Sequence, residues 1–173
     1  MGGNESTATF RMLRAAESDQ FYNVSATGID LGQSFVSIPA GTRDASIAIV
    51  PRPVSTATDV TITVTDSYGT VSTKVHVVPP HLVGASLSPT SMQGGQTASL
   101  MLTLDGPAPA GGRTITLVST KPSLMVPASV TIPEGGNAIT ISIPSTAVTK
   151  VPAITLTARL DAARLKMPIT LTP

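Results

Sequence analysis

Aliphatic and polar residues alternate along several short segments of this chain. The alternation is clearest over 97–104 and returns over 154–160 and 165–171. A period of two places successive side chains on opposite faces, so each segment predicts a β-strand with one buried face. Turn-forming residues interrupt the pattern about every 8–12 positions, which is typical of an antiparallel β-sandwich. In the second half we predict seven strands, over 83–88, 98–104, 114–119, 129–132, 138–143, 154–160 and 165–171.

The first half of the chain repeats the sequence pattern of the second half. Residues 36–79 match residues 130–173 at a constant offset of 94, without a gap, for example Val36–Gly41 with Val130–Gly135. A period this long corresponds to a whole small domain, because solenoid units span about 20–50 residues. The chain therefore reads as tandem all-β domains.

The repeat sets the domain boundaries that we predict. A first β-sandwich occupies 1–78, a Pro-Pro linker occupies 79–82, and a second, seven-stranded β-sandwich occupies 83–173. Two prolines fix φ and favour an extended, semi-rigid linker. We expect such a linker to hold the two domains roughly end to end.

The first domain is predicted to lack its opening strand. Thr7–Phe10 matches Thr97–Leu100 at an offset of 90, but nothing in the six residues before Thr7 matches the strand predicted over 83–88. An incomplete sandwich exposes unpaired strand edges and an apolar groove, which another chain can fill by strand addition. The alternatives are that the sequence is cut from a longer array, or that the domain tolerates the loss.

One segment conflicts with this scheme. Met12–Glu17 has helix propensity, yet it lies where the repeat predicts a strand and its following loop. Tertiary context often overrides propensity, so we give the repeat priority.

Composition narrows the possible partners. Aromatic residues make up 3% of the chain and charged residues 12%, with a net charge of +1. A nucleic-acid footprint requires a basic stripe, so we predict no nucleic-acid partner. Cysteine is absent, which excludes a disulfide scaffold and cysteine-based zinc sites. No run of about 18 apolar residues could span a bilayer, and the N-terminus lacks the apolar region of a signal peptide.

The turn and loop motifs of the second half indicate a family resemblance. Leu87–Ser91, the Gly94-Gly95 pair, the loop Gly106–Gly112, the segment Val126–Pro133 and the closing alternating strand together resemble a bacterial immunoglobulin-like repeat domain of tandem surface and secreted proteins. The resemblance covers nearly all of 82–173. It is weaker over 7–80, where Ala15–Gln20 replaces the Gly-Pro-Ala-Pro-Ala-Gly-Gly loop.

The resemblance implies two immunoglobulin-like antiparallel β-sandwiches, the first without its opening strand. It also implies a spacer, stalk or adhesive role outside the cell, and no catalytic residues to carry over. The cysteine pair and core tryptophan of antibody domains are absent from the sequence.

Several residues are candidates for chemistry, and each has a simpler structural interpretation. His76 and His81 could suggest a metal pair, but we expect His76 to face solvent and His81 to lie in the linker. A catalytic triad is equally unsupported. Asp66 and Asp105 could bind calcium between the domains, whereas Asx turns explain most of the acids, namely Asp30, Asp59, Asp66, Asp105 and Asp161.

Three further motifs have the same status. Gly94-Gly95 and Gly111-Gly112 lead into predicted strands, so we interpret them as turns rather than phosphate loops. Gly2 fits a loose myristoylation pattern, and Asn4-Glu5-Ser6 and Asn23-Val24-Ser25 fit the glycosylation pattern, which matter only in a eukaryotic host. In the aromatic pair Phe21-Tyr22 we expect the Phe in the core and the Tyr at its rim, and we place Tyr68 in a turn.

These observations predict a protein without enzymatic activity, catalytic residues, cofactor, metal or membrane insertion. We expect a stiff tandem-domain spacer that acts as a structural, display or adhesive module of a bacterial or phage surface assembly. The alternatives are a self-assembling filament, sheath or virion-decoration subunit in which a neighbour's strand completes the first domain, and a carbohydrate-binding accessory module. The expected location is extracellular, on a cell or virion surface.

Overall fold

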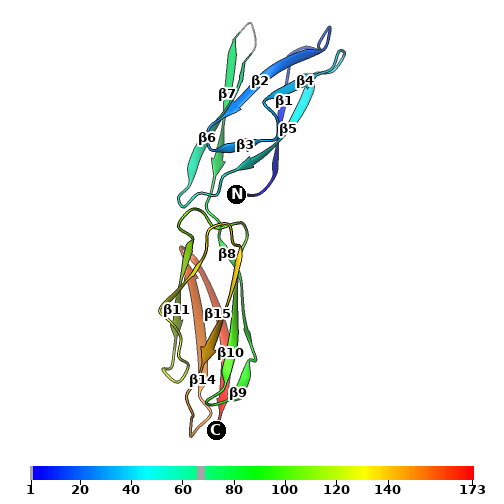
Figure 1. Cartoon of the computed structure of the whole chain (residues 1–173). Coiled ribbons are helices and arrows are strands. Elements are labelled where there is room, and N and C mark those ends of the chain that lie inside the picture. Colours follow the sequence, from blue (N-terminus) through cyan, green and yellow to red (C-terminus); the bar gives the residue numbers. More distant parts are fainter. Residues whose placement is uncertain (1, 66–68) are drawn as a thin grey trace. The chain divides into compact units, whose positions relative to one another are not determined.

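A computed structural model describes residues 2–65 and 69–173, and it is all-β over these residues. The chain divides into two compact units, Met1–Pro79 and Pro80–Pro173, which are coloured in sequence order in Figure 1. Each unit has its own core and is described separately.

The second unit is a two-layer sandwich of eight strands. One sheet has the order β13-β10-β8 and the other the order β12-β11-β14-β15-β9. The strands are β8 (Leu82–Ser88), β9 (Ser91–Gln93), β10 (Thr97–Leu104), β11 (Arg113–Ser119), β12 (Ser129–Ile132), β13 (Ala138–Pro144), β14 (Ala153–Leu160) and β15 (Ala163–Thr172).

The core of this unit follows the alternation of the sequence. Leu100 and Leu102 on β10 and Leu156 on β14 are completely buried, while Ser99 and Met101 are exposed. Twenty buried apolar side chains form one cluster between the two sheets. Burial of one large aliphatic side chain stabilises a fold by about 1.5–3 kcal/mol, so this inner face specifies the strand register.

The first unit has the same two layers with fewer strands. Its sheets have the orders β1-β5-β3 and β4-β2-β6-β7. The strands are β1 (Ser6–Arg11), β2 (Gln20–Ala26), β3 (Ile29–Leu31), β4 (Phe35–Ile38), β5 (Asp44–Pro51), β6 (Thr58–Thr65) and β7 (Thr70–Val77). Among the described residues of this unit, eight buried apolar side chains form the core cluster.

Strand pairing shows which elements of the two units correspond. β1 and β5 pair as β10 and β13 do, and β4-β2-β6-β7 has the same order as β12-β11-β14-β15. β8 and β9 have no counterpart in residues 2–65 and 69–79. The prediction that the first sandwich lacks its opening strand is therefore confirmed, and the short strand β9 is missing as well.

The first described residues correspond to the turn that follows β9. The Gly94 N–H donates to the Thr172 carbonyl at 2.8 Å, and the Gly2 N–H donates to the Val78 carbonyl at 3.4 Å. Gly3 has a φ of 83°, a left-handed value that glycine adopts without strain, and Gly95 matches it at 93°. The described residues of the first sandwich thus contain no counterpart of 82–93.

The structure adds two short strands that alternation did not reveal. β9 pairs in parallel with the end of β15, so the second unit has eight strands rather than seven and is not purely antiparallel. β3 pairs with β5 in the first unit, where the second has only a bridge between Leu124 and Ser145. Segments of three residues are too short to show a period.

The structure keeps the offset of 94 on β5 and changes the offset of β1 from 90 to 92. The Met12 N–H donates to the Arg43 carbonyl, as the Leu104 N–H does to the Asn137 carbonyl. Arg43 therefore matches Asn137 at 94 and Met12 matches Leu104 at 92, which agrees with the pairing registers of both strand pairs. The slip of two residues keeps every inward side chain on the inner face. The sequence therefore showed the correct faces of β1 with a displaced register.

The segment with helix propensity is a loop. β1 ends at Arg11, and the Ala16 N–H donates to the Thr42 carbonyl at 2.9 Å, while the Gly41 N–H donates to the Ala16 carbonyl at 2.7 Å. Ala16 is 5% exposed. These contacts fix the loop against the turn before β5, so tertiary contacts override the helix propensity, as the repeat predicted.

Candidate functional site

An apolar groove lies along β1 in the first unit. Its volume is about 550 Å³, and its walls come from β1 and β7, with a floor from the other strands of both sheets. The apolar wall residues include Ala8 and Phe10 on β1, Met12 directly after it, and Val71 and Val75 on β7. The groove thus opens where the two layers of the sandwich are not closed by a strand.

The corresponding positions of the second unit are closed. Leu102 and Leu104, which match Phe10 and Met12 at the offset of 92, are 0% and 3% exposed because β8 pairs alongside β10. Phe10 and Met12 are only half-buried. The groove is therefore an inner face of the sandwich that lacks the cover provided by β8.

The opposite wall shows the same difference. Val71 on β7 is 74% exposed and Val75 is half-buried. On β15 of the second unit, Ile169 corresponds to Val75 and is 2% exposed. The exposed valine of β7 is part of a strand face that its counterpart buries.

The backbone of β1 is also unpaired on the groove side. The Met12 N–H donates to the Arg43 carbonyl at 2.8 Å, so Met12 and every second residue before it point their backbone N–H and C=O groups toward β5. In an antiparallel ladder the next residue points its N–H and C=O the other way. Thr7, Thr9 and Arg11 therefore direct backbone groups to the free edge, since β1 pairs with β5 alone among the described strands.

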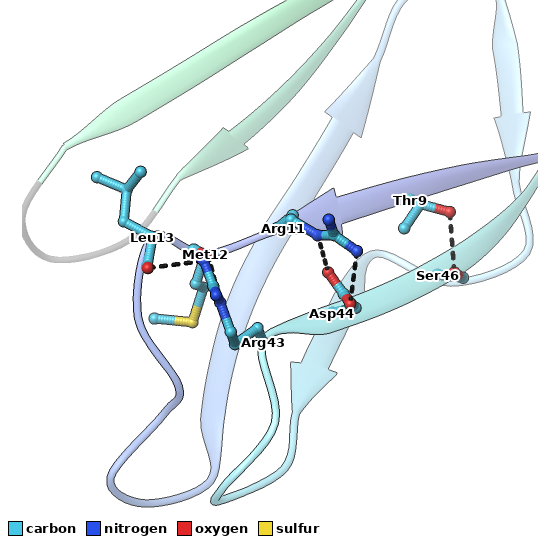
Figure 2. Close-up of polar contacts among 7 residues, drawn as sticks. All are labelled: Thr9, Arg11, Met12, Leu13, Arg43, Asp44 and Ser46. Carbon is cyan, nitrogen blue, oxygen red and sulfur yellow. Dashed lines mark hydrogen bonds and ion pairs between the residues drawn. The ribbon is translucent and has the colours of Figure 1, made fainter.

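Side chains attach β1 firmly to β5, as Figure 2 shows. Arg11 donates twice to the Asp44 carboxylate, at 2.6 Å from Nε and 3.1 Å from Nη2. The Thr9 and Ser46 hydroxyls lie 3.1 Å apart. These pairs come from exposed side chains on the outer face of the ladder.

A second arginine holds the end of β1. Arg43 donates to the Met12 carbonyl at 3.2 Å and to the Leu13 carbonyl at 2.8 Å (Figure 2). The hydrogen bonds from Arg11 hold the pKa of the Asp44 carboxyl below its usual range. The free edge is therefore presented on a strand that is anchored from its other side.

The two histidines do not form a pair. The Nδ1 atom of His76 lies 2.7 Å from Asp59 Oδ1, and this hydrogen bond lowers the pKa of Asp59. The His76 side chain is 63% exposed, which confirms its predicted solvent-facing position. His81, just before β8, lies 3.4 Å from Asp105 Oδ2. Each histidine thus contacts an aspartate of its own unit.

The remaining aspartates serve structural contacts. Asp30 accepts from Arg52 at 3.0 Å, Asp161 pairs with Arg113, and Asp105 Oδ1 accepts the His81 N–H at 2.7 Å. Asp66 lies outside the described residues. Within residues 2–65 and 69–173, no cluster of three or more His, Asp or Glu side chains could hold a metal ion.

The expectation for the aromatic pair is wrong. Phe21 is 66% exposed, whereas Tyr22 is half-buried against the core with its hydroxyl 3.5 Å from the Met12 sulfur. Tyr22 falls on the inner face of β2 together with Val24, whereas Phe21 and Asn23 face outward. Phe35, half exposed on the adjacent strand β4, lies opposite Asn23. Tyr68 is outside the described residues.

The glycine pairs lie in turns that lead into strands, as predicted. Gly94 and Gly95 precede β10, and Gly111 and Gly112 precede β11. The modification motifs at Gly2, Asn4 and Asn23 stay predictions. No helix of the described chain is long and apolar enough to cross a membrane.

Comparison with known proteins identifies solved structures of similar fold. No family model matches the chain, and no curated protein matches it at a significant level. Invasin, a bacterial integrin-binding protein, is similar at a TM-score of 0.51 and 16% identity, over 98% of this chain and 40% of the invasin chain. Domains 4 and 5 of the S-layer protein SbsC give 0.40 and 16%, over 93% of this chain and 74% of theirs. An amphioxus IgVJ-C2 molecule gives 0.38 and 13%, over 99% and 98%.

The likeness to invasin shows an immunoglobulin-like fold, and the all-β sandwich agrees with it. The predicted fold class is therefore confirmed. The chain spans about 40% of the invasin chain that it matches, so integrin binding is a property of invasin only. The finer resemblance, to bacterial tandem repeats, stays a prediction.

Proposed function

We propose that this chain is a non-enzymatic structural or adhesive module of a bacterial or phage surface assembly. The observation that carries the proposal is the free edge of β1 beside an apolar groove, in an immunoglobulin-like sandwich. Unpaired edges are usually protected because they pair with other chains. A retained edge of this kind supports a role in contact with other proteins.

Location tests the proposal directly. An antiserum against the chain should label intact cells or particles of the source in immunogold electron microscopy. A matched sample with the gene deleted gives the background. Labelling that requires prior lysis would contradict a surface role.

The predicted spacer role depends on the linker at Pro79 and Pro80. Two prolines restrict the chain to extended conformations. Replacing both by glycine should broaden the distribution of interdomain distances measured between spin labels on the two units. An equally broad distribution in the wild-type chain would rule out a stiff spacer.

A self-assembling subunit is the second candidate, and the free edge favours it as well. The chain would then form oligomers through the first unit. Light scattering after size exclusion, over a wide concentration range, should show a mass that rises with concentration. A strict monomer at the highest concentration would exclude self-assembly but leave the surface module intact.

A carbohydrate-binding module is the third candidate, favoured by the exposed aromatic side chains of Phe21 and Phe35. They project from neighbouring strands on the outer face of one sheet, since Phe21 lies opposite Ser37 and Phe35 opposite Asn23. Sugar rings stack on such platforms. A glycan array should give a signal that Phe21→Ala removes and that Val118→Ala, at an exposed valine of the second unit, keeps. A silent array would exclude this candidate.

A further inference from the structure

We propose that the groove along β1 receives one extended segment of another polypeptide, which runs antiparallel to β1 and carries aliphatic side chains at alternate positions. This inference rests on the proposed role in protein assembly, and it specifies the occupant. The pattern is that of β8, the strand that covers the corresponding edge of the second unit.

The second unit supplies the register. On β10, Leu87 of β8 lies opposite Leu100 and Ala85 opposite Leu102. Transferred at the offset of 92 that relates β1 to β10, these two positions of the incoming segment lie opposite Ala8 and Phe10. Leu87 is 6% exposed in its own unit, so a matching side chain would fill the groove between β1 and β7.

The incoming backbone has partners in place. The backbone N–H and C=O groups of Thr9 and Arg11 point to the free edge. In the second unit, the same groups of Ser99 and Met101 point to β8. A segment of about seven residues satisfies them, because β8 itself has seven. Strand addition gains backbone hydrogen bonds from the edge and specificity from alternate side chains.

The donor is a different polypeptide rather than a second copy of this chain. Every long extended segment described in this chain already belongs to a sheet. β8 has the right pattern, but Leu82 and Leu87 are 4% and 6% exposed in the core of the second unit. A second copy could donate β8 only by opening that core, and large buried aliphatics cost about 1.5–3 kcal/mol each to expose.

The test uses the whole chain and a synthetic peptide with the sequence of Leu82–Ser88, capped at both ends. A control peptide carries Leu82→Ser and Leu87→Ser. Binding is followed by two-dimensional NMR of labelled chain. We expect saturable shifts of the Thr7, Thr9 and Arg11 amides and of β7, together with a higher Tm of the first unit. The control peptide should bind at least about tenfold more weakly, because it lacks the two buried side chains.

Protein variants separate edge pairing from general destabilisation. Thr9→Pro removes one N–H that faces the free edge and leaves the ladder to β5 intact, so it should weaken peptide binding by at least about tenfold. Ser37→Pro makes the same change on β4, an edge strand of the other sheet. The Val24 N–H donates to the Ser34 carbonyl, so Ser37 directs its own N–H away from β2, to the free edge of β4. Thr9→Val removes only the hydroxyl contact to Ser46. Both controls should bind the peptide within about twofold of wild type.

Three results would overturn the inference. One is the absence of shifts at millimolar peptide with a folded first unit. Another is equal binding of the two peptides, or binding that Thr9→Pro leaves unchanged. The third is a dimer of the chain alone that Thr9→Pro abolishes, because the occupant would then be a second copy. None of these results affects surface labelling, so failure here and failure of the proposed surface role are distinguishable.

Discussion

The two sandwiches of this chain share one plan and differ at a single edge. In the second unit, β8 lies against β10, and Leu102 and Leu104 are buried. In the first, β1 has no such neighbour among the described residues, and Phe10 and Met12 are half-buried over a groove of about 550 Å³. The same inward side chains thus form a closed core in one unit and a binding surface in the other.

This contrast shows that the burial of an inward side chain depends on the neighbouring strands as well as on the alternation of its own strand. The alternation on β1 prepares an apolar face, but the face becomes core only when an adjoining strand excludes water. The following predictions test how far the two units behave as the same fold with and without that strand.

The largest expected effect concerns the matched positions Leu102 and Phe10. Leu102→Ala should destabilise the second unit by about 2–5 kcal/mol, since it leaves a cavity in a closed core. Phe10→Ala should destabilise the first unit by less than about 2 kcal/mol, because its site is already open to solvent. Denaturant unfolding with a reporter in each unit measures both.

Ile62→Ala and Leu156→Ala provide the matched control for this pair. Ile62 and Leu156 are 1% and 0% exposed, at positions that correspond at an offset of 94. Their losses of stability should agree within about 1 kcal/mol. A Phe10→Ala loss as large as that of Leu102→Ala would show that the groove is closed in solution.

The next effect tests whether Gly2 and Gly94 occupy the same turn. A Cβ on Gly2 would lie 2.5 Å from the Arg52 carbonyl oxygen, and one on Gly94 would lie 2.8 Å from the Thr146 carbonyl oxygen. Both contacts are with backbone, so Gly2→Ala and Gly94→Ala should each destabilise their own unit by about 1–3 kcal/mol. Gly69→Ala, with no atom near the added Cβ, is the control. Thermal scans that leave the Gly2→Ala unit unchanged would break the correspondence.

A smaller gain is expected when the missing element is supplied. A copy of Leu82–Gln93 placed directly before Gly2, in place of Met1, should close the first sandwich. Its Tm should rise by at least about 4 °C, the shift that about 1 kcal/mol produces in a domain of this size. The same extension with serine at the positions of Leu87 and Met92 is the control. An equal Tm for both extensions would mean that the groove does not select aliphatic side chains.

The smallest effect is electrostatic and belongs to the first unit. Hydrogen bonds from Arg11 and from His76 lower the pKa of Asp44 and of Asp59 respectively. A lowered folded-state pKa contributes stability that is present above the unfolded value of 3.8 and is lost as pH falls through the folded value. The double variant Asp44→Asn and Asp59→Asn should therefore lower Tm slightly at pH 7, and the difference should vanish near pH 2.

The second unit provides the internal reference for this measurement, since its thermal transition contains neither pair. Both pairs are exposed, so salt should also reduce the difference at neutral pH. A Tm difference that persists at low pH would assign the effect to packing rather than to charge.

Alternation and repetition in the sequence determined the all-β class, most strand positions and the shortfall at the start of the first unit. Periods of two over 97–104 and 154–160 are long enough to define a buried face. The match of Thr7–Phe10 to Thr97–Leu100 identifies β1 as the counterpart of β10, with a slip of two residues. These features are local, because each depends on neighbours along the chain.

Only the tertiary structure determined which distant segments pair in a sheet and in which register. The three-residue strands β3 and β9, the shift of β1 from an offset of 90 to 92, and the outward position of Phe21 all depend on pairing between distant segments. The groove has the same origin, because its walls on β1 and β7 belong to different sheets and stay apart in the sequence. Hydrogen-bond pairing and exclusion of water act between such segments, so no local pattern contains them.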